Sequence, residues 1–184
     1  FIFMTIMGMG FGLQPVVGFN YGAKKYERIV ESVRITLVAA TTFGVFGLAI
    51  IYLLKEQLLG LFSTDPEYLA VGKDAIMIMV LGTPLIGLNI ITSTLFQALG
   101  KAKPAFILSL SRQILFLIPL VIILPHLYSL DGVWAAFPIA DSLAFLLSVF
   151  LLFRLYKIFK GHRNHSKTGV GSETADQISS SNIP

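Results

Sequence analysis

The sequence predicts an all-α protein whose helices form a polytopic bundle in a membrane. Of its 184 residues, 55% are hydrophobic and only 13% are charged, whereas a soluble domain carries about 25% charged residues. The charges are also crowded together, which leaves long uncharged runs at 1–23, 35–54, 75–100 and 113–130. Each run is close to or above the about 20 apolar residues that a helix needs to cross the hydrocarbon core. Lone strands could not satisfy their backbone groups there, and the alternation of a β-barrel is missing.

Five transmembrane helices follow from these runs. We expect them at about 1–19, 35–54, 75–99, 104–124 and 132–153. Together they make a transmembrane domain over residues 1–160.

Prolines mark several ends and bends of these helices. Asp65 is the expected N-cap of a helix that has Pro66 in its first turn. A straight helix over 66–99 would be about 51 Å long at about 1.5 Å per residue. We therefore expect it to begin outside the membrane and to bend near Pro84. Pro125 is expected to end the fourth helix, because the residue before a proline disfavours the helical region.

The positions of the basic residues predict the orientation. Eleven of the 14 Lys and Arg residues fall on one side of the predicted bundle: Lys24, Lys25, Arg28, Arg34, Lys101, Lys103, Arg154, Lys157, Lys160, Arg163 and Lys167. Lys55 and Lys73 fall on the other side, and Arg112 lies within a span. The basic side is predicted to be cytoplasmic, with the carboxy terminus inside. The basic pI of about 9.4 is therefore a signal of topology, and no nucleic-acid partner is expected.

The two ends of the chain differ in composition. Residues 161–184 are rich in Ser, Gly, Asn and Thr, and they predict a disordered cytoplasmic tail. Residue 1 is Phe within an apolar run, so we expect the chain to be the carboxy-terminal part of something longer. Cysteine is missing from the sequence, which excludes disulfides and thiolate metal sites. No metal site is predicted, because His162 and His165 lack a third ligand in the tail.

Four of the five predicted helices contain an internal proline. These are Pro15, Pro84, Pro119 and Pro138. Each proline removes a backbone hydrogen bond and bends or loosens its helix. This pattern favours mobile helices around a cavity, although proline is also common in membrane helices generally. Gly8 and Gly12 form a small-xxx-small pair, and we expect close helix packing at this pair.

Arg112 and Asp141 are the ionised residues inside the predicted spans. Such residues are costly in lipid and are functional hypotheses by default. At about 1.5 Å per residue, Arg112 lies about 12 Å from the inner end of its helix. Asp141 lies about 16 Å from the inside of a core about 30 Å thick. The two can therefore meet if their helices are neighbours, either as a structural ion pair or as a site where Asp141 exchanges a proton or cation.

Uncharged polar residues are a second set of pathway candidates. Asn89, near the middle of the third helix, is the strongest of them, and Gln113 directly follows Arg112. Hydrogen bonding between helices is the commoner use of such residues. The 15 Phe and 5 Met could line a site for bulky aromatic cations, but most of them are expected to face lipid or other helices.

The segment 12–28, GLQPVVGFNYGAKKYER, resembles a signature of the multidrug and toxic compound extrusion (MATE) family. In that signature a helix ending in Gln-Pro, here Gln14 and Pro15, leads through a short turn into a basic loop. The turn residues here are Asn20, Tyr21, Gly22 and Ala23. We expect Gly22 to permit the tight turn. Further resemblances lie at 94–101, 111–113, 118–120 and 132–141.

The order and spacing of these segments resemble helices eight to twelve of a twelve-helix member, most like the bacterial MepA-like branch. The resemblance implies an antiporter that expels small organic, often cationic, compounds in exchange for protons or sodium ions. Two six-helix lobes would alternate access in the bacterial inner (plasma) membrane, with this chain as most of the second lobe. Its partners would be the first lobe and membrane lipids. No cofactor beyond the coupling ion is implied, and no enzyme activity.

One departure from the family pattern concerns the coupling carboxylate. Some branches carry an acidic residue in helix ten, but this sequence has none between Asp74 and Lys101. The expected coupling carboxylate therefore shifts to the first lobe or to Asp141.

Two alternatives to an efflux antiporter stay open at this point. A lipid-linked oligosaccharide flippase of the same superfamily would need more basic residues in its cavity than Arg112 alone. An integral membrane enzyme would need clustered acids or histidines at membrane depth, whereas His126 stands by itself.

Overall fold

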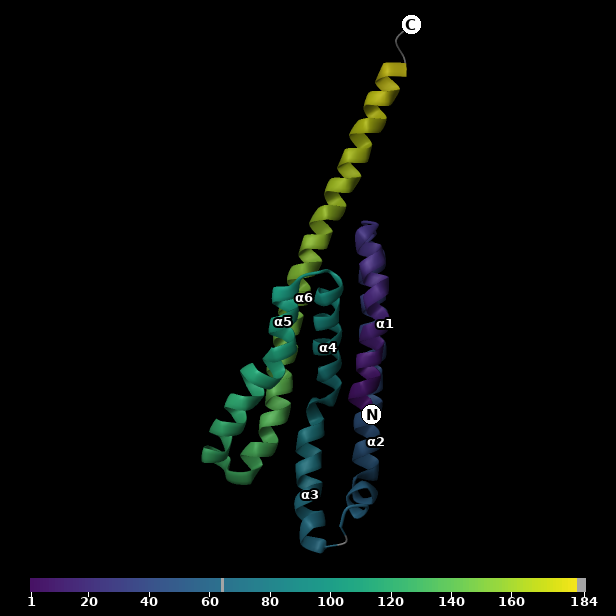
Figure 1. Cartoon of the computed structure of the whole chain (residues 1–184). Coiled ribbons are helices and arrows are strands. Elements are labelled where there is room, and N and C mark those ends of the chain that lie inside the picture. Colours follow the sequence, from purple (N-terminus) through teal and green to yellow (C-terminus); the bar gives the residue numbers. More distant parts are fainter. Residues whose placement is uncertain (64, 182–184) are drawn as a thin grey trace. The chain divides into compact units, whose positions relative to one another are not determined.

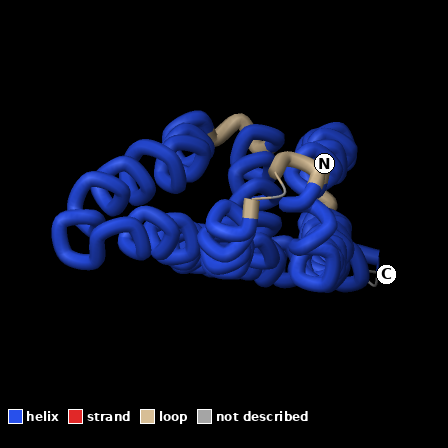
Figure 2. The backbone as a smooth tube through the Cα atoms, turned by 90° about the horizontal axis from the view of Figure 1, so that it is seen from below, coloured by secondary structure: helices blue, strands red, loops and turns tan. Residues whose placement is uncertain are grey.

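A computed structural model of the chain describes the backbone of residues 1–63 and 65–181 and the side chains of 1–63 and 65–160. All regular secondary structure in the described residues is helical, joined by short loops (Figure 2). The all-α class predicted from composition is confirmed.

The helices follow one another with few residues between them (Figure 1). The first half contains α1 (Ile2–Gly22), α2 (Tyr26–Gly60), α3 (Pro66–Met79), the 3-10 turn η1 (Val80–Gly82) and α4 (Thr83–Ala98). The second half contains α5 (Ala102–Leu110), the π-helical segment η2 (Ser111–Leu117) and α6 (Ile118–Ser181). Four helical stretches of the described chain are long and apolar enough to cross a membrane: Ile2–Gly22, Tyr26–Gly60, Pro66–Ala98 and Ala102–Lys160.

The chain divides into two compact units, residues 1–149 and 150–184. In the first unit, α4 packs against α1, α2 and α5. The second unit is the remainder of α6, whose backbone is helical to Ser181. Side chains from residue 161 onward and residues 182–184 lie outside the described residues, so the disordered tail stays a prediction.

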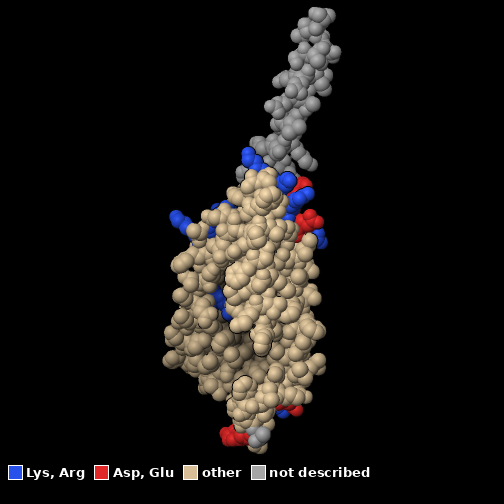
Figure 3. Space-filling view, turned by 45° about the vertical axis from the view of Figure 1, so that its right-hand side comes forward, with Lys and Arg blue, Asp and Glu red and all other residues tan. Residues whose placement is uncertain are grey.

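In the first unit, more large apolar side chains are exposed than are buried. Exposed examples occur on α1, α2, α5 and α6, among them Phe11, Phe46, Phe106 and Leu146. Figure 3 shows a broad face on which charged atoms are rare, with a small blue patch in a hollow at mid-height. Such a surface is unsuited to water and suited to lipid or to further apolar helices.

The helices run beyond the predicted apolar spans. Arg28 and Arg34, predicted in a loop, lie in α2, and Lys55 also lies within α2. Lys73 lies in α3. The prediction placed Arg28 and Arg34 in a loop because it followed the apolar runs, whereas helix formation continues through charged residues with good helix propensity. Lys73 lies in the helix that was expected to begin at Pro66.

The turn between α1 and α2 corrects the expected role of Gly22. The Lys25 N–H donates to the Asn20 carbonyl at 2.8 Å, and the Lys24 N–H donates to the Tyr21 carbonyl at 3.0 Å. This is a Schellman motif, which requires a left-handed residue just after the C-cap Ala23. That residue is Lys24 (φ 57°), whereas Gly22 lies in the last turn of α1. The prediction that Gly22 permits the turn is wrong, since the motif needs its left-handed residue two positions later.

The third predicted helix begins and bends as expected. Asp65 is the N-cap of α3, and its Oδ1 accepts the Glu67 N–H at 2.9 Å. The helix then tightens into η1 just before Pro84. Gly44 of α2 lies against this bend, where an added Cβ would be 3.1 Å from the Pro84 Cα. The lack of a side chain on Gly44 therefore lets α2 approach the bend.

The fourth predicted helix does not end at Pro125. Helical structure continues past this proline to a break at Tyr128 and Ser129, where Ser129 has φ 51° and ψ −131°. The chain reverses direction at this break (Figure 1). Proline removes one hydrogen bond from a helix. The helix tolerates this loss at Pro125 and ends three residues later. An added Cβ on Gly132 would lie 2.4 Å from the Leu124 carbonyl oxygen, so the tight return requires glycine there.

Close glycine packing on α1 occurs at Gly10 instead of the predicted Gly8 and Gly12. An added Cβ on Gly10 would lie 3.0 Å from the Thr94 Oγ1, whereas those on Gly8 and Gly12 would meet no described atom within 4 Å. The prediction that Gly8 and Gly12 pack closely is therefore wrong for the described part of the chain, because α4 lies on the face of α1 that carries Gly10.

Candidate functional site

The two ionised residues of the predicted spans form an ion pair in the first unit. Arg112 lies in η2 and Asp141 in α6, and the Arg112 Nε donates to the Asp141 Oδ1. The Asp141 side chain is 2% exposed, whereas 24% of the Arg112 side chain is exposed. A carboxylate buried to this extent requires a charged partner to compensate for its lost hydration. Arg112 is that partner, and it lies before the reversal at Tyr128 and Ser129, whereas Asp141 lies after it.

The backbone that carries Arg112 is wound as a π-helix. Pro119 follows η2 by two residues and has no N–H, so the Leu115 carbonyl loses its ordinary α-helical donor. A π-helical turn accommodates such a mismatch with an extra residue and is often found at functional sites. The sequence contained the proline, but it did not predict that the helix widens at Arg112.

The backbone opposite Asp141 is also irregular. Gly82, the last residue of η1, faces the carboxyl group so closely that an added Cβ would lie 2.8 Å from the Asp141 Cβ and 2.9 Å from its Cγ. Asp141 thus occupies space that a side chain at residue 82 would fill. The carboxyl group of Asp141 therefore packs against the third helical stretch at the bend that was predicted near Pro84.

A polar contact between α4 and α6 lies one heptad beyond Gly82 and Asp141. The Asn89 Nδ2 donates to the Ser148 Oγ at 3.1 Å. Ser148 in turn donates to the Ala144 carbonyl at 2.8 Å. Asn89 is 6% exposed and Ser148 is fully buried, so the predicted pathway residue lies inside the helix packing and makes a contact between helices.

A chain of uncharged polar groups links α1, α4 and α5. Gln14 donates to Gln97 at 3.5 Å, and Gln97 donates to the Ser93 Oγ at 3.3 Å. The Ser93 and Ser109 hydroxyls lie 2.8 Å apart. Gln14 of the recognised motif therefore serves as an interhelical hydrogen-bond donor.

Two buried polar atoms of this region have no hydrogen-bond partner among the described residues. They are the Asn20 Oδ1 and the Thr92 Oγ1. Asn20 does use its amide, which donates to the Val16 carbonyl at 2.8 Å. Each unpaired oxygen is a place where a water molecule or another donor would be stabilised.

The remaining predicted residues lie apart from the ion pair. The Gln113 side chain is exposed and makes no hydrogen bond among the described residues, whereas its carbonyl accepts the Ile118 N–H. Pro15 lies within α1, and Tyr21 packs edge-on against the Tyr26 ring with centroids 6.2 Å apart. Gly22 and Ala23 complete the end of α1. The motif therefore shapes a helix end and the turn that follows it.

Three residues around the site were not predicted from the sequence. Gly82 contacts the Asp141 carboxyl group, and Ser109 and Ser148 are hydrogen-bond partners of Ser93 and Asn89. The heptad spacing of Asp141 and Ser148, which places both on one helix face, was a usable signal for Ser148. No comparable signal pointed to Gly82, because the contact depends on where α6 lies.

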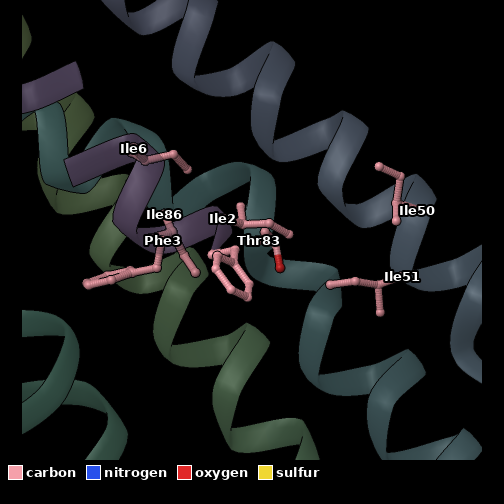
Figure 4. A pocket seen from close by; sticks show the side chains of 8 residues that line it. Ile2, Phe3, Ile6, Ile50, Ile51, Thr83 and Ile86 are labelled. Carbon is pink, nitrogen blue, oxygen red and sulfur yellow. The ribbon is translucent and has the colours of Figure 1, made fainter. Parts of the chain in front are cut away.

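A cavity of about 450 Å³ opens between α1, α2 and the start of α4 (Figure 4). Its walls include Ile2, Ile6, Ile50 and Ile86, and Thr83 provides a hydroxyl. This lining offers shape and apolar surface but no charge. Among the described residues, no three His, Asp or Glu side chains gather where they could hold a metal ion.

An ion pair of another kind lies outside the predicted spans. Glu56 of α2 and Lys73 of α3 approach to 2.7 Å, and the Glu56 side chain is 65% exposed. The hydrogen bond and charge of Lys73 hold the pKa of Glu56 below its ordinary value. Solvent screens this pair, so it contributes little to stability.

Comparison with known proteins gives consistent matches over most of the chain. The family model described as MatE matches residues 1–123. "Multidrug export protein MepA" of Staphylococcus haemolyticus (strain JCSC1435) is 22% identical over 152 residues, covering 83% of this chain and 33% of the relative. The protein of the same name from Staphylococcus aureus (strain MSSA476) is 23% identical over the same share. The chain thus spans about a third of the length of these curated relatives.

Solved structures share the helical arrangement. A structure described as that of the MATE multidrug transporter DinF-BH has a TM-score of 0.80 and 49% identity, over 86% of this chain and 35% of that chain. An inward-facing multidrug resistance MATE family transporter has a TM-score of 0.79 at 22% identity, over 87% of this chain and 38% of that chain. The second similarity concerns the fold alone.

Long apolar helices with polar contacts buried between them define this chain as a bundle of helices suited to a membrane. More particularly, the chain belongs to the MatE family of multidrug efflux transporters.

Proposed function

We propose that this chain forms part of an antiporter that exports small organic, often cationic, compounds in exchange for protons or sodium ions. The observation that carries the proposal is the 49% identity, at a TM-score of 0.80, to a MATE multidrug transporter. The chain would contribute helices eight to twelve of two six-helix lobes. With the reversal at Tyr128 and Ser129 counted as a turn between membrane helices, the described helices provide five crossings.

Alternating access requires helices that change their packing without unfolding. The ion pair of Arg112 and Asp141 lies where two helices leave α-helical geometry, at η2 and next to η1. Breaks of this kind in transporter helices occur near binding sites between repeats. We propose Asp141 and Arg112 as residues of the ion or substrate pathway, with Asn89 and Gln113 as weaker candidates on the same helices.

Transport by a MATE protein that carries this chain at its carboxy terminus tests the proposal. The protein is reconstituted in vesicles, and uptake of a cationic rhodamine dye is followed under an imposed pH gradient or sodium gradient. We expect one gradient to drive uptake and its dissipation to stop it. Uptake that is indifferent to both gradients would contradict antiport.

The Asp141→Asn variant separates the two roles left open for the carboxyl group. If Asp141 exchanges the coupling ion, the variant loses dependence on the gradient that drives the wild type. If Asp141 is only structural, gradient dependence stays unchanged and thermal stability falls. Ser142→Ala, next to it on an exposed part of α6, is the matched control.

The proposed location is the inner (plasma) membrane of a bacterium, with the carboxy terminus in the cytoplasm. Because the sequence contains no cysteine, single cysteines at Glu67 and Lys101 report sidedness in an otherwise cysteine-free transporter. An impermeant maleimide added to intact cells is expected to label the cysteine at residue 67. The cysteine at residue 101 should react only after permeabilisation, and the reverse pattern would overturn the orientation.

A further inference from the structure

Arg112 has hydrogen-bonding capacity that Asp141 does not use. A guanidinium group has five N–H donors in a rigid plane. The Nε–H donates to Asp141, and no other side-chain hydrogen bond of Arg112 forms within residues 1–63 and 65–160. The two terminal nitrogens therefore keep four N–H donors without a partner in the described part of the chain.

Part of the Arg112 side chain is accessible from outside the first unit. A quarter of the Arg112 side chain is exposed, and the next three residues of η2, Gln113, Ile114 and Leu115, are exposed as well. Asp141, by contrast, is buried on the inner side of the guanidinium. A ligand at the surface of η2 can thus approach the terminal nitrogens while Asp141 keeps its bond to Nε.

The chemistry of such a ligand follows from the donor geometry. Two parallel N–H groups of an arginine match the two oxygens of a carboxylate, and such bonds are stronger than neutral ones. Asp141 is the single acidic residue of the predicted spans, so this chain offers no second carboxylate at that depth. Unpaired donors at membrane depth are costly, which favours an anionic group brought by a ligand.

We propose that the terminal guanidinium nitrogens of Arg112 bind the carboxylate of zwitterionic amphiphilic substrates. Arg112 then determines specificity for compounds that carry a carboxylate beside their cationic part. Asp141 is a positioning residue, since its bond to Nε fixes the plane of the guanidinium. This inference rests on the proposed export function and assigns a substrate feature to one residue of the site.

A matched pair of dyes tests the inference. Rhodamine 110 carries a free carboxylate, and rhodamine 123 is its methyl ester, so the two differ at the group that Arg112 would bind. Binding of each dye is measured by fluorescence anisotropy on the purified transporter that carries this chain. In Arg112→Gln, we expect Kd for rhodamine 110 to rise about tenfold or more, as for loss of a hydrogen bond to a charged group. Kd for rhodamine 123 should change less than about twofold.

Two further variants keep the test decisive. Arg112→Lys retains the charge but loses the planar fork, so it should weaken rhodamine 110 binding by less than Arg112→Gln does. It also supplies the comparison if Arg112→Gln fails to fold. Ile122→Ala changes an exposed apolar side chain of α6 that has no part in the proposed site, and it should leave both Kd values unchanged.

The outcomes distinguish the inference from the proposed function. Equal changes for both dyes, or no change for rhodamine 110, would overturn the role of Arg112 while export of cationic dyes stands. If the wild-type transporter binds neither dye, the proposed function fails and this inference fails with it.

Discussion

Helix α6 touches the third helical stretch at two places, which differ in the charge of the α6 residue and in backbone geometry. Asp141 meets Gly82, and Ser148 meets Asn89. The contacts lie seven residues apart on both helices, or about 10 Å along a helix axis. Because both numbers increase together, the two helices run parallel in a heptad-like register.

The charged contact occurs where the backbone is irregular, and the neutral contact occurs where it is regular. At Asp141 the facing helix tightens into η1, and the arginine partner comes from the π-helical η2. At Ser148, two α-helical residues exchange one hydrogen bond without a break. The buried carboxylate of Asp141 therefore depends on a glycine opposite it and on an arginine from a π-helical segment. The hydrogen bond between Asn89 and Ser148 requires only that the two side chains lie close together.

The largest effect is expected from filling the space beside the carboxylate. In Gly82→Leu, the new side chain must displace Asp141, which combines overpacking with the breaking of a buried ion pair. We expect a cost of about 3 kcal/mol or more, seen as a large fall in the thermal midpoint of the transporter. Gly60→Leu is the control, because an added Cβ there meets no described atom within 4 Å. Similar falls in both variants would show that the contact at Gly82 is unimportant.

The two members of the ion pair should respond unequally to removal. Arg112→Gln leaves a buried carboxyl group without its charged partner, which costs about 3 kcal/mol where such pairs are broken. Asp141→Asn leaves an arginine that is partly exposed and can find other acceptors, so its cost should be smaller. Thermal unfolding of both single variants and the double variant measures this difference. Equal losses would contradict the asymmetry in burial.

The neutral contact should be worth less than the charged one. Ser148→Ala leaves the Asn89 amide buried without an acceptor, at a cost of about 1–3 kcal/mol. Asn89→Ala removes one net hydrogen bond worth about 1 kcal/mol, because Ser148 keeps its bond to the Ala144 carbonyl. The same unfolding measurement applies. If Asn89→Ala were more damaging than Arg112→Gln, the comparison between the two contacts would be wrong.

The smallest effect is expected at the exposed pair of Glu56 and Lys73. Since Lys73 lowers the pKa of Glu56, the pair stabilises the fold above the ordinary glutamate pKa, and this contribution is lost as the pH falls through the lowered value. Solvent screening keeps it small. Thermal midpoints at pH 7 and pH 3 are compared for wild type and Lys73→Met. An equal pH response in the two proteins would show that the pair adds nothing.

Local signals predicted the places where helices begin and bend better than the places where they end. The Asp65 cap and the bend before Pro84 are properties of a few neighbouring residues, and both appear in the structure. The end at Pro125 and the turn at Gly22 were wrong. At the end of α1, the hydrogen bonds of a complete Schellman motif place the left-handed residue at Lys24 rather than at Gly22.

The two charged residues of the candidate site could be predicted from the sequence, but most of the residues that contact them or lie near them could not. Arg112 and Asp141 were identifiable because ionised residues are rare in apolar spans. Their similar expected depths in the membrane indicated that they could meet. Serine is common in such helices, so Ser109 and Ser148, the hydrogen-bond partners of Ser93 and Asn89, could not be identified in this way. Which polar residues pair depends on helix rotation, and rotation is not encoded by hydropathy alone.

The sequence by itself determined that this chain is a bundle of membrane helices of the MatE family, because the spacing of charges and the motif at 12–28 are local and specific. Only the tertiary structure decided that Asp141 faces Gly82, that Arg112 pairs with Asp141 through its Nε, and that Asn89 is used between helices. These contacts depend on how helices distant in sequence are placed and rotated, and that placement is decided by packing over the whole unit rather than by any one segment.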